Sequence, residues 1–109
     1  MYKYNVKSDK SKKNDPPSLF EAAAKNDLYM MRVALDAGES LEERRSGDLM
    51  TPVHLAAFLG NMQFIRAAIE ECPAVVWVFD RKKRRPIEHS QARNDFESAD
   101  LLLGEMYPH

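Results

Sequence analysis

The sequence predicts an all-α protein, built as a short solenoid of stacked helix pairs. Apolar residues recur at helical spacing, as in Met62, Ile65, Ala68 and Ile69, which is the pattern of an amphipathic helix. An offset of 34 residues also places similar residue types on one another in three stretches of the chain. Self-similarity at this period is typical of solenoids, in which each repeat buries its apolar face against its neighbours.

The central stretch carries the clearest local signals. Residues 51–61 read Thr-Pro-Val-His-Leu-Ala-Ala-Phe-Leu-Gly-Asn. Thr51 suits a helix N-cap and Pro52 the first helical position. Gly60 allows the chain to turn back, because glycine adopts left-handed backbone angles without steric cost. These signals predict a helix over 52–59 and an antiparallel helix over 62–72.

The same stretch resembles the signature of the ankyrin-repeat family, Thr-Pro-Leu-His-x-Ala-Ala-x-x-Gly. The resemblance implies helix pairs joined by hairpin fingers. The fingers and the first helix of each pair would form a concave face that binds a partner. In this motif the histidine, here His54, braces the adjacent turn with a hydrogen bond. A catalytic role for His54 is the weaker alternative.

Two degenerate copies flank the central one. An offset of 34 residues places Asn26 and Asn94 on Gly60, and asparagine also tolerates the left-handed turn. We therefore expect a repeat domain over 18–109, with repeats at about 18–50, 51–84 and 85–107. The additional helices are expected near 18–25, 28–37, 86–93 and 96–106. Arg85 replaces the capping threonine in the third copy, which should cost about 1 kcal/mol.

Composition agrees with one small cytoplasmic domain. The 109 residues are 44% hydrophobic and 30% charged, with a net charge of −1. No stretch approaches the roughly 20 apolar residues of a membrane span, and we expect no secretory signal. Cys72 is the only cysteine, so an internal disulfide is impossible and a reducing compartment fits.

Residues 1–17 differ from the rest of the chain. Five lysines lie between Met1 and Lys13, and Pro16-Pro17 follows. We interpret this segment as a flexible basic N-terminal tail. The alternation of Tyr2, Tyr4 and Val6 with polar residues leaves open a second interpretation, a strand that adds to the sheet edge of a partner.

Enzyme signatures are missing from the sequence. It contains neither a glycine-rich phosphate loop nor a Gly-x-Ser-x-Gly motif. His54, His89 and His109 are not spaced with carboxylates as metal ligands would be. We therefore expect no enzyme activity, no cofactor and no metal.

The finger at residues 74–85 departs most from the family pattern. Trp77 replaces the usual asparagine and Phe79 takes a variable place, and an extended finger would put both on one face. They are either a binding hot spot or a pair that folds back over the helix ends. Residues 81–85 are all basic. We rank an acidic protein partner first, plain solvation second, and a nuclear address or nucleic acid third.

The finger at residues 42–50 and the central helix add more apolar residues. Leu49 and Met50 precede Thr51, and Phe58 and Leu59 take positions that face the partner in the family. With Trp77 and Phe79 they could form one exposed patch, although some of them must be core. The predicted partner-binding residues are Leu49, Met50, Phe58, Leu59, Trp77, Phe79, Arg81, Lys82, Arg84 and Arg93.

We therefore expect a non-catalytic protein-binding module that acts as a stoichiometric binder or inhibitor of one target. It would work as a monomer or in a heteromeric complex, away from membranes. The alternative is a nuclear or nucleic-acid-associated factor that uses the basic tail and residues 81–85. A self-assembling protein that uses the apolar patch is a third possibility.

Overall fold

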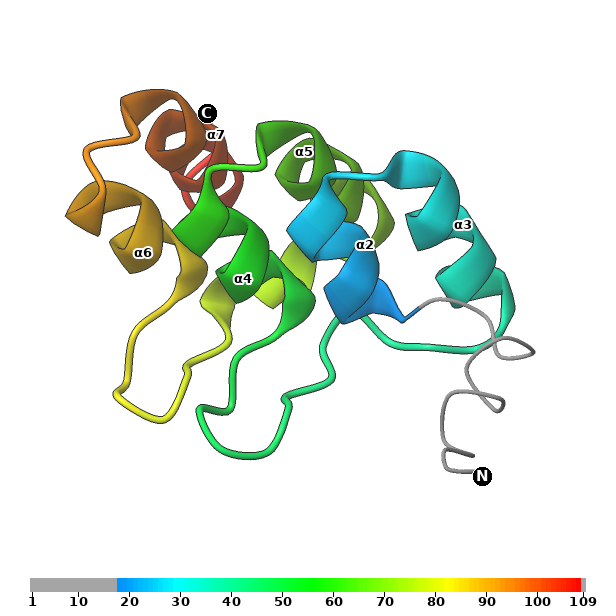
Figure 1. Cartoon of the computed structure of the whole chain (residues 1–109). Helices are drawn as coiled ribbons and strands as arrows, with labels where there is room; N and C mark the ends of the chain where they lie inside the picture. The colour runs from blue at the N-terminus through cyan, green and yellow to red at the C-terminus, as the bar shows by residue number, and fades with distance from the viewer. Residues whose placement is uncertain (1–17, 109) are drawn as a thin grey trace.

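The structure, a computed structural model, describes residues 18–108 (Figure 1). This range contains six α-helices, one short 3-10 helix and no strand, which confirms the all-α prediction. The elements are α2 (Leu19–Lys25), α3 (Leu28–Asp36), α4 (Pro52–Leu59), α5 (Met62–Glu71), η1 (Pro73–Trp77), α6 (Pro86–Ala92) and α7 (Phe96–Met106). The tail predicted at residues 1–17 lies outside the described residues.

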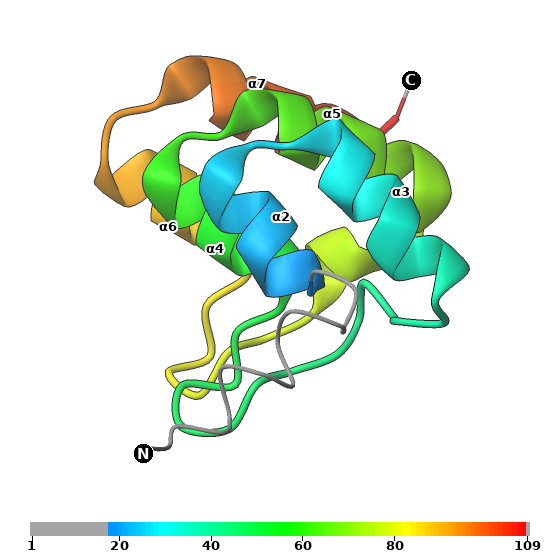
Figure 2. The same cartoon turned by 45° about the vertical axis from the view of Figure 1, so that its right-hand side comes forward.

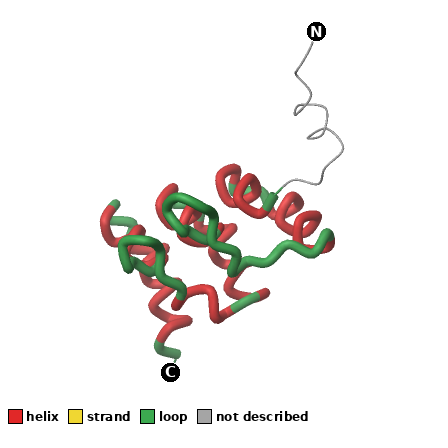
Figure 3. The backbone as a smooth tube through the Cα atoms, turned by 90° about the horizontal axis from the view of Figure 1, so that it is seen from below, coloured by secondary structure: helices red, strands yellow, loops and turns green. Residues whose placement is uncertain are grey.

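The helices form three antiparallel pairs that stack side by side. Helices α2, α4 and α6 contact one another in order, and α3, α5 and α7 form a second layer behind them (Figures 1 and 2). The two long connections between pairs leave the same side of the stack as loops (Figure 1). Seen from that side, the loops lie in front of the helices (Figure 3).

The six α-helices lie within one residue of their predicted bounds, because local signals specify their ends. Ser18, Asp27 and Thr51 each accept a hydrogen bond from a backbone N–H of the first helical turn. In the third pair, Arg85 cannot accept such a bond. The carboxylate of Glu88 instead accepts from the backbone N–H of Arg85, so half of a reciprocal cap remains.

The tight turns within the pairs use left-handed residues, as predicted. Asn26, Gly60 and Asn94 have φ values of 55°, 78° and 60°. Asparagine replaces glycine at the two ends of the stack because it is among the few other residues that adopt this conformation readily.

Small residues let neighbouring inner helices approach closely. Ala22 and Ala23 of α2 and Ala56 and Ala57 of α4 are fully buried. At the position equivalent to Ala56, α6 carries Ser90, which is also fully buried. The Ser90 hydroxyl has no hydrogen-bond partner within the described residues. The contact between α4 and α6 therefore buries an unpaired polar group that the alanine contact between α2 and α4 does not.

The prediction of an extended finger from residue 74 onward is wrong for its first part. Pro73 begins a 3-10 turn, in which Val75 donates to the carbonyl of Cys72 at 3.1 Å. The turn forms because proline pre-sets a helical φ and because it buries both Val75 and Val76 completely. Only residues after Trp77 continue as an extended loop.

Candidate protein-binding surface

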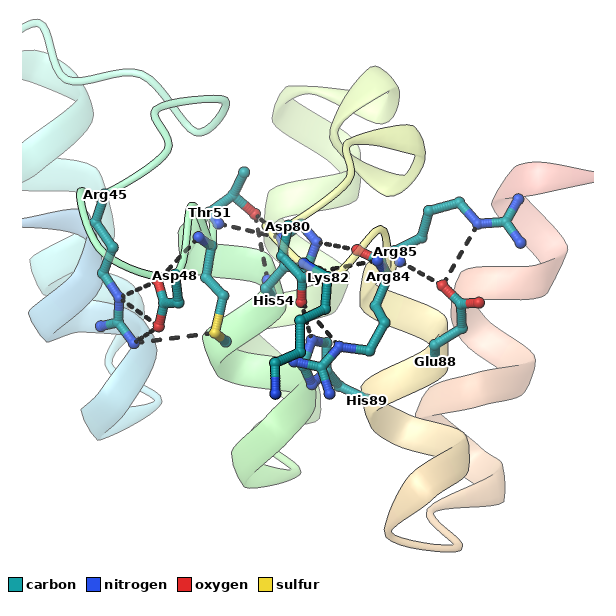
Figure 4. A network of polar contacts seen from close by, with 11 residues as sticks. Arg45, Asp48, Thr51, His54, Asp80, Lys82, Arg84, Arg85, Glu88 and His89 are labelled. Carbon is teal, nitrogen blue, oxygen red and sulfur yellow. Dashed lines mark hydrogen bonds and ion pairs between the residues drawn. The ribbon is translucent and has the colours of Figure 1, made fainter.

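The second loop closes into a hairpin, residues 80–84, that is organised by one buried carboxylate. The Asp80 side chain is 1% exposed. It accepts hydrogen bonds from the backbone N–H groups of Lys82 and Arg84, both at 2.9 Å. It also accepts from Arg84 Nε at 3.2 Å and from His89 Nε2 at 2.9 Å (Figure 4). One side chain thus ties the tip of the hairpin to helix α6.

These contacts keep Asp80 ionised. Burial alone would raise the pKa of Asp80, but the hydrogen bonds from Arg84 and His89 and the charge of Arg84 outweigh burial and lower the pKa to about 2. A buried carboxylate is stable only when its lone pairs are satisfied in this way. The hairpin therefore has one strongly preferred geometry at neutral pH.

His54 braces the same hairpin from helix α4, as the sequence predicts. Its Nδ1 accepts from the backbone N–H of Thr51 at 3.1 Å, and its Nε2 lies 3.0 Å from the carbonyl oxygen of Arg84. Because Nδ1 accepts, Nε2 carries the proton and donates to Arg84. Burial is the main cause that lowers the pKa of His54, so the neutral ring is favoured.

The two hairpins are also joined to each other. The first hairpin, residues 45–50, is held by the backbone bond from Arg45 to Met50 and by the Arg45–Asp48 ion pair at 2.9 Å. Arg81 then crosses to it: its backbone N–H donates to the Asp48 carbonyl at 2.8 Å, and its Nε donates to the Gly47 carbonyl. The loops therefore form one braced surface.

The five basic residues 81–85 have different roles in the structure. Arg84 pairs with Asp80 at 3.2 Å. The Arg85 guanidinium carbon lies 5.8 Å from the ring centroids of both Trp77 and Phe79. Within residues 18–108, Lys82 forms no ion pair, and neither does Lys83, which was not among the predicted binding residues. The positive charge open to a partner therefore centres on residues 81–83.

Two of the predicted apolar residues lie exposed on α4. Phe58 is 56% exposed and Leu59 is 39% exposed. The Phe58 ring packs edge-on against His89 of α6 at 6.1 Å, and His89 is itself held by Asp80. This aromatic side chain therefore stands on the same network that fixes the second hairpin.

Met50 and Leu49 contribute less to such a surface. Met50 is only 6% exposed, so it belongs to the interior and cannot join an exposed patch. Leu49 is half-buried at a φ of 59°, where it occupies the same turn position as Lys83, at 63°. Left-handed angles are costly for both residue types, and both serve the turn.

Trp77 and Phe79 do not group with Phe58. Trp77 is 43% exposed and packs edge-on against Tyr107, which follows α7, at 5.7 Å. Phe79 is 46% exposed and shares the Arg85 guanidinium with Trp77. These two aromatic residues therefore contact the residues that flank the third helix pair, which are Arg85 before α6 and, for Trp77, Tyr107 after α7.

Arg93 has a structural contact that its prediction as a binding residue did not include. Its Nη1 donates to the carbonyl oxygen of Phe58 at 2.8 Å. Its guanidinium lies 2.9 Å from the point where a Cβ on Gly60 would stand. A cation at the carboxyl end of a helix is favourable, so Arg93 stabilises the end of α4.

Two residues central to the site were missed by sequence reasoning. Asp80 and His89 bond to each other across nine residues of chain, and only the family pattern, which has aspartate at position 80, offered a signal.

Cys72 is half-buried, and burial raises the pKa of its thiol. Residues 18–108 hold no cluster of three or more metal-ligating side chains. No helix in this range is long and apolar enough to cross a membrane.

Comparison with known proteins adds no assignment: no protein-family model matches the chain, and no curated protein matches it either.

Proposed function

We propose that the chain is a short ankyrin-repeat solenoid and acts as a non-catalytic, protein-binding module. The stacking of three antiparallel helix pairs supports the family assignment, as do the Thr51–His54 cap and the left-handed turns at 34-residue intervals. Its single thiol fits a reducing, cytoplasmic setting.

One observation carries the functional proposal: exposed apolar residues stand on a rigid polar network. Phe58 and Leu59 are exposed on α4, and Phe58 packs on His89, which is bonded to the Asp80 that fixes the second hairpin. A rigid surface loses little conformational entropy on binding, which favours affinity. An exposed aromatic residue inside a charged rim is also the usual anatomy of an interface hot spot.

Histidine is a common catalytic residue, but His54 and His89 serve the scaffold here. Both ring nitrogens of His54 are hydrogen-bonded to protein atoms, and His89, bonded to Asp80 through Nε2, is only 5% exposed. A general base needs a free nitrogen within reach of its substrate. This arrangement supports a binding role over a catalytic one.

The chemistry of the partner follows from the charges that remain open. Arg81, Lys82 and Lys83 are exposed at the tip of the second hairpin, which Asp80 and His89 connect to Phe58 of α4. We therefore propose an acidic protein surface as the partner. Arg84 is paired with Asp80 and Arg85 lies between two aromatic rings. That leaves fewer cations for the several phosphate contacts that nucleic-acid binding requires.

The test compares matched variants in an affinity capture. The affinity and the association rate of each variant are then measured with the purified partner. Phe58→Ser removes the apolar anchor and Lys82→Glu reverses one open charge. Arg66→Glu, an exposed residue of α5, is the matched charge-reversal control on the outer helix layer. Melting temperatures of all three variants check that they fold.

We expect Phe58→Ser to weaken the partner complex about tenfold or more, and Lys82→Glu to slow its association. Arg66→Glu should leave both quantities unchanged. Equal capture by all variants would refute this surface, and loss of capture after nuclease treatment would favour nucleic acid instead. A turnover that Phe58→Ser abolishes in folded protein would refute the non-catalytic assignment.

A further inference from the structure

A shallow hollow lies on the exposed side of α7, the last helix of the second layer (Figure 1). It has a volume of about 330 Å³ and is lined by Asp100, Leu103, Gly104 and Tyr107. These residues are three or four positions apart, so they lie on one side of the helix, and all four are exposed. The volume is at the lower end of the range for ligand pockets, about 300–1,000 Å³. The hollow therefore suits one side chain of a larger partner.

Gly104 keeps this hollow open, although the fold does not require a glycine there. Glycine is the least favourable helix residue after proline. Gly38, Gly47 and Gly60 have positive φ values, but Gly104 does not. A Cβ at Gly104 would meet no atom within 4 Å, so close packing does not explain the glycine either. A glycine does, however, let a ligand approach the helix backbone closely.

The repeat register shows which side chains the hollow lacks. At the positions of Asp100 and Gly104, the two earlier outer helices each carry an arginine followed by an acid, which are Arg32 and Asp36 in α3 and Arg66 and Glu70 in α5. In α3 this pair is joined, with Nη1 of Arg32 3.8 Å from Oδ1 of Asp36. Helix α7 has a carboxylate at the arginine position and no side chain at the acidic one. A guanidinium from outside would therefore find both a partner and free space.

The charges around the hollow also favour a cation. Helix α7 contains three acidic residues and no basic residue. Asp100 forms no ion pair within residues 18–108, so its charge is open to a ligand. The hollow reaches the last turn of α7, where the helix carbonyl groups stabilise a positive charge.

Tyr107 adds an aromatic wall to the hollow. Its side chain is 57% exposed. The Trp77 ring packs against it at 87°, with the ring centroids 5.7 Å apart, and this contact restrains the position of the Tyr107 ring. An aromatic ring and a carboxylate that line one hollow suit a cation with an apolar stem.

We propose that the hollow binds an arginine side chain presented by another protein. The guanidinium pairs with Asp100 and lies on Tyr107, and its methylene stem crosses Gly104. Arginine fits better than lysine, because its planar guanidinium can both donate two N–H groups to a carboxylate and stack on an aromatic ring. Residues 1–17 contain five lysines but no arginine, so this segment lacks the side chain that fits best. The site does not rest on the hairpin surface, for which we propose an acidic partner.

The first experiment titrates three short peptides into the isotope-labelled full chain and follows its backbone amide signals by NMR. The peptides are acetyl-Gly-X-Gly-amide, where X is arginine, lysine or citrulline, the uncharged analogue of arginine. The arginine peptide should shift the signals of Leu103 and Gly104 saturably, with a dissociation constant on the order of 1 mM, because one exposed ion pair gives weak binding. The lysine peptide should bind about threefold or more weakly, and the citrulline peptide should show no saturable binding.

Three variants then locate the site. Asp100→Asn removes a charge at constant size and should raise the dissociation constant of the arginine peptide about threefold or more. Glu105→Gln is the matched control, because it removes the same charge from α7 at a residue that does not line the hollow, and it should bind like the unaltered chain. Gly104→Gln gives α7 a side chain as long as that of Glu70 in α5. It should raise the melting temperature by about 2–5 °C, since glycine is a poor helix former, and abolish saturable binding.

Other results would overturn the proposal. Absence of saturable shifts at Leu103 and Gly104 up to about 10 mM of the arginine peptide refutes the site. Equal binding of the citrulline peptide, or of the arginine peptide by Asp100→Asn, refutes the role of charge, and unchanged binding by Gly104→Gln refutes the role of the open glycine.

Two results would replace the occupant. A preference for the lysine peptide would assign the hollow to residues 1–17, and self-association that Asp100→Asn abolishes would assign it to a second copy of the chain. All these outcomes are independent of the hairpin surface, because the three variants leave Phe58 and Lys82 unchanged.

Discussion

Replacing Asp80 by asparagine isolates the contribution of the buried carboxylate to folding. The substitution keeps the size of the side chain but removes the charge that pairs with Arg84 and accepts the hydrogen bond from His89. An amide also presents one acceptor oxygen where the carboxylate uses two. The hairpin should therefore lose both an ion pair and some of the hydrogen bonds that its backbone N–H groups donate to residue 80.

The magnitude follows from the pKa of Asp80. It falls from 3.8 to about 2 on folding, and each unit is worth about 1.4 kcal/mol, so ionised Asp80 stabilises the fold by about 2 kcal/mol. Because the pKa of the folded state is the lower one, this stabilisation is complete above about pH 5 and disappears as the pH falls through 2. Asp80→Asn should remove about 2–3 kcal/mol at pH 7 and very little at pH 2.

Urea unfolding followed by circular dichroism at pH 7, 5, 3 and 2 measures this difference. Glu70→Gln, on the exposed side of α5, is the matched control and should cost less than about 0.5 kcal/mol at every pH. A constant difference between Asp80→Asn and the unaltered chain from pH 7 to pH 2 would show that charge is not the cause. A cost at pH 7 as small as that of Glu70→Gln would refute the role of Asp80 altogether.

Three further substitutions test the same structure. Burial lowers the pKa of His54, so the free energy of unfolding should fall as the pH drops below about 6.5. In urea unfolding between pH 7.5 and 5, His54→Gln should lack this fall. Ser90→Ala should raise the free energy of unfolding by about 1 kcal/mol, because it removes a buried hydroxyl without a partner; a loss of stability would reveal a bond to this hydroxyl. Gly60→Ala should cost about 1–2 kcal/mol in thermal unfolding, since it combines a φ of 78° with a contact to Arg93; an unchanged melting temperature would contradict the described turn.

The helices could be predicted from the sequence because their signals are local. Thr51, Pro52 and Gly60 each act within a few residues of their own helix, and alanine pairs mark the inner layer wherever it is tightly packed. The bracing of the second hairpin by His54 could be predicted only through the family resemblance. Its acceptor, the Arg84 carbonyl, is 30 residues away in sequence, and no local pattern points to it.

The sequence could not predict which apolar side chains are exposed and which are buried. Met50 and Phe58 look alike as apolar residues near the central helix, yet one is 6% exposed and the other 56%. Trp77 is the last residue of a 3-10 turn that forms because two valines are buried between α5 and α7. Arg93 bonds to a carbonyl 35 residues away. Each outcome depends on a neighbour in the stack that only the assembled fold provides.

The basic run at residues 81–85 divides between an exposed hairpin tip and contacts within the fold. Arg84 turns toward the buried Asp80, whereas Arg85 turns toward Trp77 and α7 (Figure 4). The chain changes direction here because Arg85, with φ −92° and ψ 166°, is the extended N-cap residue just before α6. Arg81, Lys82 and Lys83 are exposed on the hairpin, whereas Arg85 lies against the Trp77 and Phe79 rings and pairs with Glu88 at 3.8 Å. The proposed acidic partner would therefore contact the charges before Arg84, because the fold itself holds Arg84 and Arg85.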